Sequence, residues 1–118
     1  MEKQPVFSII DKQTAMHYLW GANCDAWVLT GKPELSVKLE KMPKETKETR
    51  HFHKQAQQLF YIISGTAIFY IQEEKQIVLS QQSILIEPLI RHCIANESEE
   101  ALEFMVVSQP SADKDRYE

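Results

Sequence analysis

Three histidines are the residues of this chain best suited to chemistry. His51 and His53 lie in TRHFHKQAQQLFYIISG, His92 lies in LIEPLIRHCIAN, and the chain holds four histidines in all. Side chains of a strand alternate between two faces, so a His-x-His pair places both imidazoles on one face, about 7 Å apart along the backbone. Neutral imidazole binds Zn, Cu, Fe and Ni. A single strand histidine is more often a core or surface residue, so the pair by itself leaves both interpretations open. With a third, distant His, the three are candidate ligands of one divalent metal ion.

Short strands are expected to position these histidines. The segment LSVKLEKM alternates, with Leu35, Val37 and Leu39 on one face and Ser36, Lys38 and Glu40 on the other. QLFYIIS is apolar on both faces, which is typical of a strand covered on both sides. We expect further strands at Val6–Ile10, at Ala26–Thr30 and in TAIFYIQ, IVLS, SILIE, RHCIAN and ALEFMVVS. Turn signals recur about every 8–12 residues, the spacing of an antiparallel sandwich or barrel.

Three local features complete the expected architecture. Ser64-Gly65 predicts a hairpin that joins QLFYIIS to TAIFYIQ, and a short helical turn is expected near Gln13–Leu19. The polar segment QPSADKDRYE predicts a mobile C-terminal tail. The core is expected to contain five apolar residues from the strand-like segments: Phe60, Ile62, Phe69, Ile71 and Phe104.

Length and composition indicate one globular domain. The 118 residues predict a single domain, with N-terminal strands in 6–30, a barrel core at about 35–108 and the tail at 109–118. The net charge of −4 argues against nucleic acid as a partner. No apolar run approaches the roughly 20 residues of a membrane helix. The N-terminus lacks the apolar stretch of a signal peptide, and Cys24 and Cys93 form no Cys-x-x-Cys motif, so a cytoplasmic protein with reduced thiols is expected.

Several other residues have structural interpretations at least as good as functional ones. The charged stretch from Lys38 to Lys54 mixes both signs, which favours a solvated face. Cys93 follows His92 and therefore should face away from the metal as a small buried residue. The remaining candidates are Trp20 and Trp27 (barrel mouth or core), Tyr61 and Tyr70 (cavity wall or packing), Asn23 and Asp25 (turn residues) and His17 (not a ligand).

The histidines and their spacing resemble the motifs of the cupin superfamily of small β-barrels. The first cupin motif contains a Gly, a His-x-His pair, a Glu and a second Gly, at whose positions this chain has Glu45, His51, His53, Gln58 and Gly65. The second motif contains Gly, Pro, Gly, His and Asn. Here His92 and Asn96 match the motif, whereas Gln81 and Leu89 replace its two glycines. Glu87 occupies the position of the proline, and the proline of this chain, Pro88, is the next residue.

The resemblance covers roughly Leu35 to Ser108 and implies both fold and site. It extends to a subgroup of single-domain bacterial cupins through WGANCDAW, LSVKLEKMP and HFHKQAQQLFYIISG. A cupin is an all-β antiparallel jelly roll, or double-stranded β-helix, whose interior holds a metal through three His and one Glu. The implied metal residues are therefore His51, His53, His92 and, in place of the Glu, Gln58. Cupins commonly dimerise, so a homodimer is expected.

Gln58 changes the chemistry that the resemblance implies. With Gln in place of Glu, a divalent site keeps a net charge of +2, which weakens metal affinity and favours an anionic small-molecule ligand. The nearest carboxylate that could act as general base is also lost. Gln58 either ligates the metal or hydrogen-bonds a neighbouring side chain or water.

Two classes of function follow from these residues. One is a metal-dependent enzyme, a dioxygenase or isomerase that uses Fe, Mn, Ni or Zn on a small anionic metabolite. The alternative is a non-catalytic cupin with a degenerate site, which binds a small ligand or serves as a structural dimer. The barrel fold does not distinguish these two classes of function, because proteins with this fold carry out many different reactions.

Overall fold

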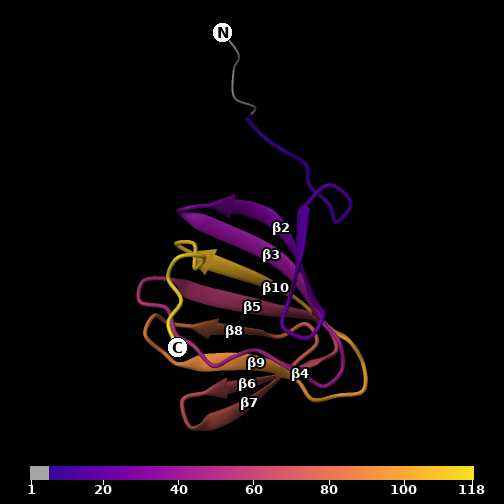
Figure 1. Ribbon diagram of the computed structural model, residues 1–118, viewed down its shortest axis with the longest axis vertical. Coiled ribbons are helices and arrows are strands. Elements are labelled where there is room, and N and C mark those ends of the chain that lie inside the picture. The colour runs from indigo at the N-terminus through magenta and orange to yellow at the C-terminus, as the bar shows by residue number, and fades with distance from the viewer. Residues whose placement is uncertain (1–5) are drawn as a thin grey trace.

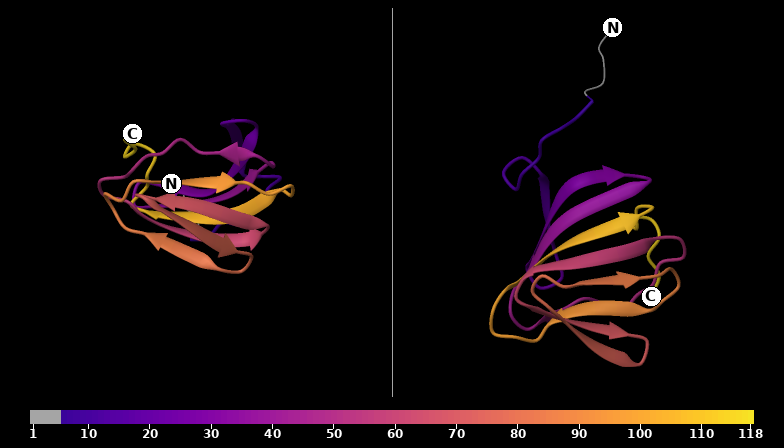
Figure 2. Two further views of the ribbon diagram at one scale, coloured as in Figure 1. Left: turned by 90° about the horizontal axis from the view of Figure 1, so that it is seen from below. Right: turned by 180° about the vertical axis from the view of Figure 1, so that it is seen from behind.

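Two antiparallel β-sheets form the computed structural model, which describes residues 6–118 (Figure 1). The six-stranded sheet has the order β1-β2-β3-β10-β5-β8, and the four-stranded sheet has the order β4-β9-β6-β7. The strands are β1 Met16–Trp20, β2 Cys24–Lys32, β3 Leu35–Met42, β4 Thr46–Lys47, β5 Gln57–Ser64, β6 Thr66–Ile71, β7 Glu74–Leu79, β8 Ser83–Ile86, β9 His92–Asn96 and β10 Leu102–Gln109. The two sheets face each other as the layers of a jelly roll (Figure 2), and the predicted all-β antiparallel class is confirmed.

The N-terminal region differs from its prediction in two places. Residues 6–10 form no strand, and the chain there extends away from the barrel (Figure 1). The helical turn expected at Gln13–Leu19 is wrong, because Met16–Trp20 is strand β1, which pairs with β2. A partner strand supplies hydrogen bonds that an isolated turn cannot, so tertiary pairing overrides the local preference. Residues 6–118 contain no helix that could span a membrane.

The turn at Gly65 connects the two sheets and does not form a hairpin. β5 pairs with β10 and β8, whereas β6 pairs with β7 and β9, so the predicted hairpin is wrong. Gly65 has a φ of +90°, and a Cβ placed there would lie 2.7 Å from the carbonyl oxygen of Ala101. This close approach to the backbone explains why a glycine stands where the chain crosses between the sheets.

The core lies between the inner faces of the two sheets. Phe60, Ile62, Phe69 and Phe104 are buried as predicted, and Ile71 is partly buried against them. The Phe60 ring lies 5.0 Å from Phe69 and 5.8 Å from Phe104, measured between centroids. These aromatic rings pack together in one part of the barrel interior, and the buried polar residues lie in the other part.

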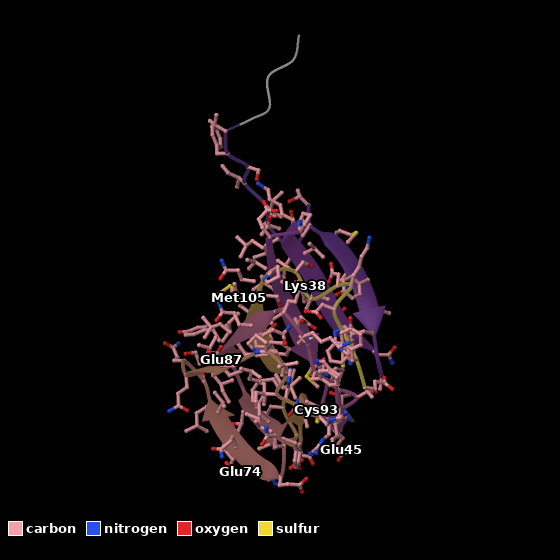
Figure 3. The ribbon with its side chains drawn as sticks, turned by 90° about the vertical axis from the view of Figure 1, so that its left-hand side faces the viewer. Lys38, Glu45, Glu74, Glu87, Cys93 and Met105 are labelled. Atoms are coloured by element: carbon pink, nitrogen blue, oxygen red, sulfur yellow. The ribbon has the colours of Figure 1, made fainter. Side chains whose placement is uncertain are left out.

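The inner face of β3 is polar over most of its length. Ser36, Lys38 and Glu40 alternate toward the interior, and the apolar Leu35, Val37 and Leu39 point outward. β5 also has apolar residues on its outer face, where Leu59 and Ile63 are 37% and 41% exposed, although its inner face carries the core residues Phe60 and Ile62. The expectation that β5 is covered on both sides is therefore wrong within the described residues. Figure 3 labels Lys38 of the inner face and Met105 of the outer face.

The C-terminal segment is docked and not a mobile tail. After β10 it runs across the ends of β5 and β8 toward β9 (Figures 1 and 2). Tyr117 and Phe52 form a β-bridge with N–H···O distances of 3.0 and 2.8 Å. The polar composition of this segment is explained by hydrogen bonds to the barrel and not by solvation alone.

Candidate metal centre

His51, His53 and His92 converge inside the barrel. Their nearest ring nitrogens all lie within 4.8 Å of one another, and each residue is at most 4% exposed. His92 begins β9, while His51 and His53 lie in the extended segment between β4 and β5. Reciprocal backbone hydrogen bonds of 3.0 and 2.8 Å join His51 to His92 and bring the distant histidine to the pair. The predicted grouping of these three residues is observed.

Backbone carbonyls fix the orientation of all three rings. His51 Nδ1 lies 2.8 Å from the Thr49 oxygen, and His92 Nδ1 lies 2.8 Å from the Ile90 oxygen. His53 Nδ1 lies 2.6 Å from the Asp115 oxygen. A carbonyl can only accept, so each Nδ1 carries the proton and each Nε2 presents a lone pair. His53 Nε2 is buried with no hydrogen-bond partner among the described residues, which fits a metal ligand.

The burial of the rings favours their neutral form. Burial lowers the pKa of His51 and of His92 to about 4 each, and hydrogen bonds from the rings to Thr49 and Ile90 oppose part of this effect. Metal ions bind neutral imidazole, so rings with such low pKa values need no deprotonation to bind a metal at neutral pH. Orientation and charge state therefore both suit a divalent ion.

Gln58 lies beside the histidines with its amide between two polar side chains. Its Oε1 is 3.3 Å from His92 Nε2, and its Nε2 donates to Ser108 Oγ at 3.0 Å. Because His92 Nε2 is unprotonated, two acceptors face each other, which is favourable when a cation lies between them. A flipped amide would instead donate to His92 and accept from the Ser108 hydroxyl. Gln58 is placed to ligate a metal in the first arrangement and to orient His92 in the second.

A cavity of about 410 Å³ lies against His51, His53 and Gln58. Besides His51, His53 and Gln58, its charged lining consists of three basic and three acidic residues: Lys38, Lys47, Arg116, Glu40, Glu48 and Asp113. Trp20 also lines it, and its buried indole N–H lies beside Glu40 without a hydrogen bond of standard geometry among the described residues. The cavity therefore offers donors and charges of both signs next to the ring nitrogens.

Two carboxylates of this cavity were not identified from the sequence. Burial, and then repulsion by Glu48, raise the pKa of Glu40 to about 7, although the charge of Lys38 opposes the shift. Burial also raises the pKa of Glu48, which Arg116 partly offsets through an ion pair of 3.3 Å. The expectation of a solvated face from Lys38 to Lys54 is therefore wrong for the members that line the cavity. The polar side of LSVKLEKM was the signal that could have identified Lys38 and Glu40.

Most other candidates lie away from the cavity. His17 is bonded to Asp25 at 2.7 Å on the outer face, so it is not part of the histidine group and Asp25 is not a turn residue. Trp27 and Tyr61 lie on that same face, and Tyr70 is bonded to Glu97 on the other sheet. The remaining residues behave as expected: Cys93 is fully buried, Asn23 is in a turn, and Trp20 lines the cavity.

Asn96 has a structural role at the end of β9. Its Nδ2 donates to the carbonyl oxygens of Met42, Pro43 and Glu100 at 2.7–3.2 Å, and its Oδ1 accepts from Ser98. The side chain thus holds the polar turn that follows β9 and keeps this strand, which begins with His92, in place.

Solved structures with the same fold cover nearly all of this chain. KdgF from Halomonas sp. matches with a TM-score of 0.80 at 15% identity over 91% of this chain and 98% of that one. A predicted oxalate decarboxylase from Thermotoga maritima gives 0.80 at 15% identity over 88% and 100%. A sugar phosphate isomerase of the cupin superfamily from Silicibacter pomeroyi gives 0.76 at 15% identity over 88% and 76%. At such identities the similarity establishes the fold alone.

Sequence comparison identifies the family. None of the functionally curated proteins matches this chain in sequence. The family model described as Cupin domain matches residues 38–108, more than half of the chain, and this range holds all three histidines and Gln58. Together with the jelly roll and the convergent histidines, this match shows that the chain belongs to the cupin family.

Proposed function

We propose that this cupin binds a divalent metal ion through His51, His53 and His92, and that the loaded site binds a small anionic metabolite. The observation that carries the proposal is the orientation of the rings: three Nδ1 atoms face carbonyl oxygens, which leaves three Nε2 lone pairs directed into one buried space. Gln58 is the candidate fourth ligand, on the geometry of its Oε1.

The charge of the site supports an anionic ligand. The ligands His51, His53, His92 and Gln58 are all neutral, so a bound divalent ion keeps its full charge. The three basic and three acidic residues of the cavity balance each other when all are ionised, and Glu40 is partly protonated near neutral pH. A carboxylate, an enediolate or a phosphate would compensate the remaining charge. Two structural neighbours carry names with anionic substrates, oxalate and a sugar phosphate, which agrees with this class.

The chain's own residues suit proton transfer to such a ligand. A bound metal ion would act as a Lewis acid that polarises a ligand oxygen. Glu40, with a pKa of about 7, can hold or release a proton near neutral pH at its carboxyl oxygen, as isomerisation of a hydroxy-carbonyl compound requires. Lys38, Arg116 and Trp20 line the same cavity and offer N–H donors that would orient an anion.

Metal analysis tests the proposal. Protein purified without chelator is expected to contain about one Fe, Mn, Ni or Zn per chain, and His92→Ala is expected to lose it. His17→Ala is the matched control, because His17 lies outside the histidine group and should retain full metal content. A metal-free wild type that also fails to bind Mn(II) or Zn(II) in titration would refute the metal site.

A second candidate is a non-catalytic ligand-binding cupin. The observation in its favour is that Gln58 stands at the position of the usual Glu and has Ser108 as a hydrogen-bond partner. Oxygen uptake by the metal-loaded protein with small carboxylates and diketones, and isomerisation of sugar phosphates, would support the enzyme. Binding of these compounds without turnover would support the second candidate.

A further inference from the structure

The C-terminal segment supplies one contact of the histidine group. Residue Asp115 lies 62 positions after His53, and its carbonyl oxygen accepts the hydrogen bond from His53 Nδ1 at 2.6 Å. His51 and His92 instead use carbonyls only two residues before them in sequence. Among the three rings, His53 is therefore the one whose orientation depends on a distant part of the chain.

The side chain of Asp115 anchors that carbonyl. Its Oδ1 accepts from the backbone N–H of Lys54 at 2.9 Å, and its Oδ2 accepts from Gln55 at 2.9 Å and Ala56 at 3.0 Å. These three consecutive N–H groups lie directly between His53 and β5. A carboxylate that accepts three backbone hydrogen bonds is a strong, geometrically fixed contact. The backbone at residue 115 is thereby locked to the backbone next to His53.

We propose that Asp115 is a positioning residue of the metal centre: its carboxylate clamps residues 54–56 so that its own carbonyl holds His53 in the Nδ1–H tautomer. The proposal rests on the metal site of the proposed function, but its structural part concerns the protein alone. In the absence of the clamp, the neutral His53 ring is free to carry its one proton at Nε2 instead of Nδ1, where it would occupy the lone pair needed for the metal. The C-terminal segment is therefore part of the site.

The tautomer can be measured directly by NMR of the metal-free protein with ¹⁵N-labelled histidine. In the wild type all three rings are expected to give the nitrogen shifts of the Nδ1–H form. In Asp115→Ala, His53 is expected to show averaged shifts of the two tautomers, while His51 and His92 keep theirs and report that the barrel is folded. Glu118→Ala is the control, since it removes an exposed carboxylate from the same segment. Retention of the pure Nδ1–H form by His53 in folded Asp115→Ala would overturn the proposal.

Metal affinity provides the second readout. Loss of such an outer hydrogen-bond partner typically weakens metal binding 10- to 100-fold, so titration with Zn(II) is expected to show a shift of this size in Asp115→Ala and none in Glu118→Ala. If Asp115→Ala did not fold, the measurement would use Asp115→Asn, which keeps one acceptor oxygen and is expected to change the His53 shifts alone. A wild type that binds no metal would refute the proposed function, whereas the tautomer of His53 would still decide this inference.

Discussion

At the scale of single residues, the amide of Gln58 is compatible with two roles beside the histidine group. Its Oε1 lies 3.3 Å from His92 Nε2, close enough for both atoms to bind one metal ion. After a flip of the amide, the Gln58 N–H would instead donate to His92 Nε2. If Oε1 ligates the metal, Gln58→Glu adds an anionic donor, which should tighten Mn(II) binding and weaken binding of an anionic ligand such as oxalate. Titration of the metal-free protein with Mn(II), wild type against Gln58→Glu, measures this.

The same titration distinguishes the other arrangement. If Gln58 donates to His92, a carboxylate cannot replace the donor, and Mn(II) binding by Gln58→Glu should be unchanged or weaker. Ser108→Ala serves as the companion variant, because it removes the partner of the amide nitrogen without changing charge. Unchanged or weaker Mn(II) binding by Gln58→Glu would indicate a centre of three histidines completed by water.

Glu40 gives the protein a measurable pH dependence. Its pKa in the folded protein, about 7, exceeds the ordinary value of 4.5, so the folded state binds the proton more tightly. The resulting stabilisation is complete below pH 4.5 and is lost as the pH rises through 7. Glu40→Gln removes this titration, so the free energy of unfolding of the variant relative to wild type should increase between pH 5 and pH 8, by on the order of 2 kcal/mol.

Urea unfolding of both proteins at the two pH values gives the difference. Subtracting the free energy of unfolding of the wild type from that of the variant cancels the contributions of the other titrating groups that the two proteins share. Glu45→Gln is the control, because Glu45 is exposed and lies outside the cavity lining. If the difference in free energy of unfolding between Glu40→Gln and wild type were the same at pH 5 and pH 8, burial would not hold Glu40 in its protonated form.

At the scale of elements, strand β10 carries much of the core. It lies between β3 and β5, and Phe104 on its inner face is 1% exposed with its ring 5.8 Å from Phe60. Removal of a buried aromatic ring leaves a cavity, so Phe104→Ala should reduce the free energy of unfolding by about 3–5 kcal/mol. Chemical denaturation measures the loss. Ile77→Ala on the exposed face of β7 should change it by less than about 0.5 kcal/mol.

The β5–β6 turn is the other sensitive element. Gly65 combines a φ of +90° with a backbone oxygen 2.7 Å from the position of a Cβ. Because that oxygen belongs to the main chain of Ala101, relief requires a shift of the backbone beside β10. Gly65→Ala should therefore lower the free energy of unfolding by about 1–3 kcal/mol or more. A thermal melt within 1 °C of wild type would contradict this strain.

At the scale of the whole molecule, the outer face of the six-stranded sheet has an apolar region on β3, β10, β5 and β8. Cross-strand neighbours on it include Leu39, Met105 and Tyr61, and next to them Val37, Val107, Leu59 and Leu85. The segment before β1 contacts this face through Lys12. Its Nζ lies 3.6 Å from Glu103 Oε1 and 4.2 Å from the centroid of the Trp27 ring. Beyond it, Val6, Phe7 and Ile9 are 94%, 74% and 87% exposed.

A homodimer through this face is our prediction for the assembly. A stable interface buries about 800 Å² per partner, and the exposed apolar residues of this face and of the N-terminal segment are the surface available for it. Two copies related by a two-fold axis would cover each face with the other copy and its N-terminal segment. Sedimentation at tens of micromolar should give twice the chain mass of 13.7 kDa.

Point variants locate the interface. Leu85→Glu, in the outer face of β8, should shift the sedimenting species to the monomer, since a buried unpaired carboxylate is costly. Ile77→Glu is the matched control, because Ile77 is comparably exposed, at 62% against 52% for Leu85, but lies on the other sheet. A wild type that sediments as a monomer, or dissociation caused by the control, would reject this interface.

The sequence alone determined the features that depend on short-range patterns. Alternation and turn residues predict most strands. The His-x-His spacing and the motif around His92 predict that the three histidines group together, which the structure shows although His51 and His53 lie outside the strands. The core residues Phe60 and Phe104 follow from the same patterns. These inferences need no knowledge of which segments meet in space.

The tertiary structure alone decided which face of β3 is inside and what distant residues add to the site. The alternation in LSVKLEKM is equally compatible with a polar or an apolar face toward the interior, and the structure places Lys38 and Glu40 in the cavity. The C-terminal segment reaches this site through contacts between residues far apart in sequence, such as Lys38 with Asp113 and His53 with Asp115. Such contacts arise from the packing of whole sheets, and no local pattern encodes them.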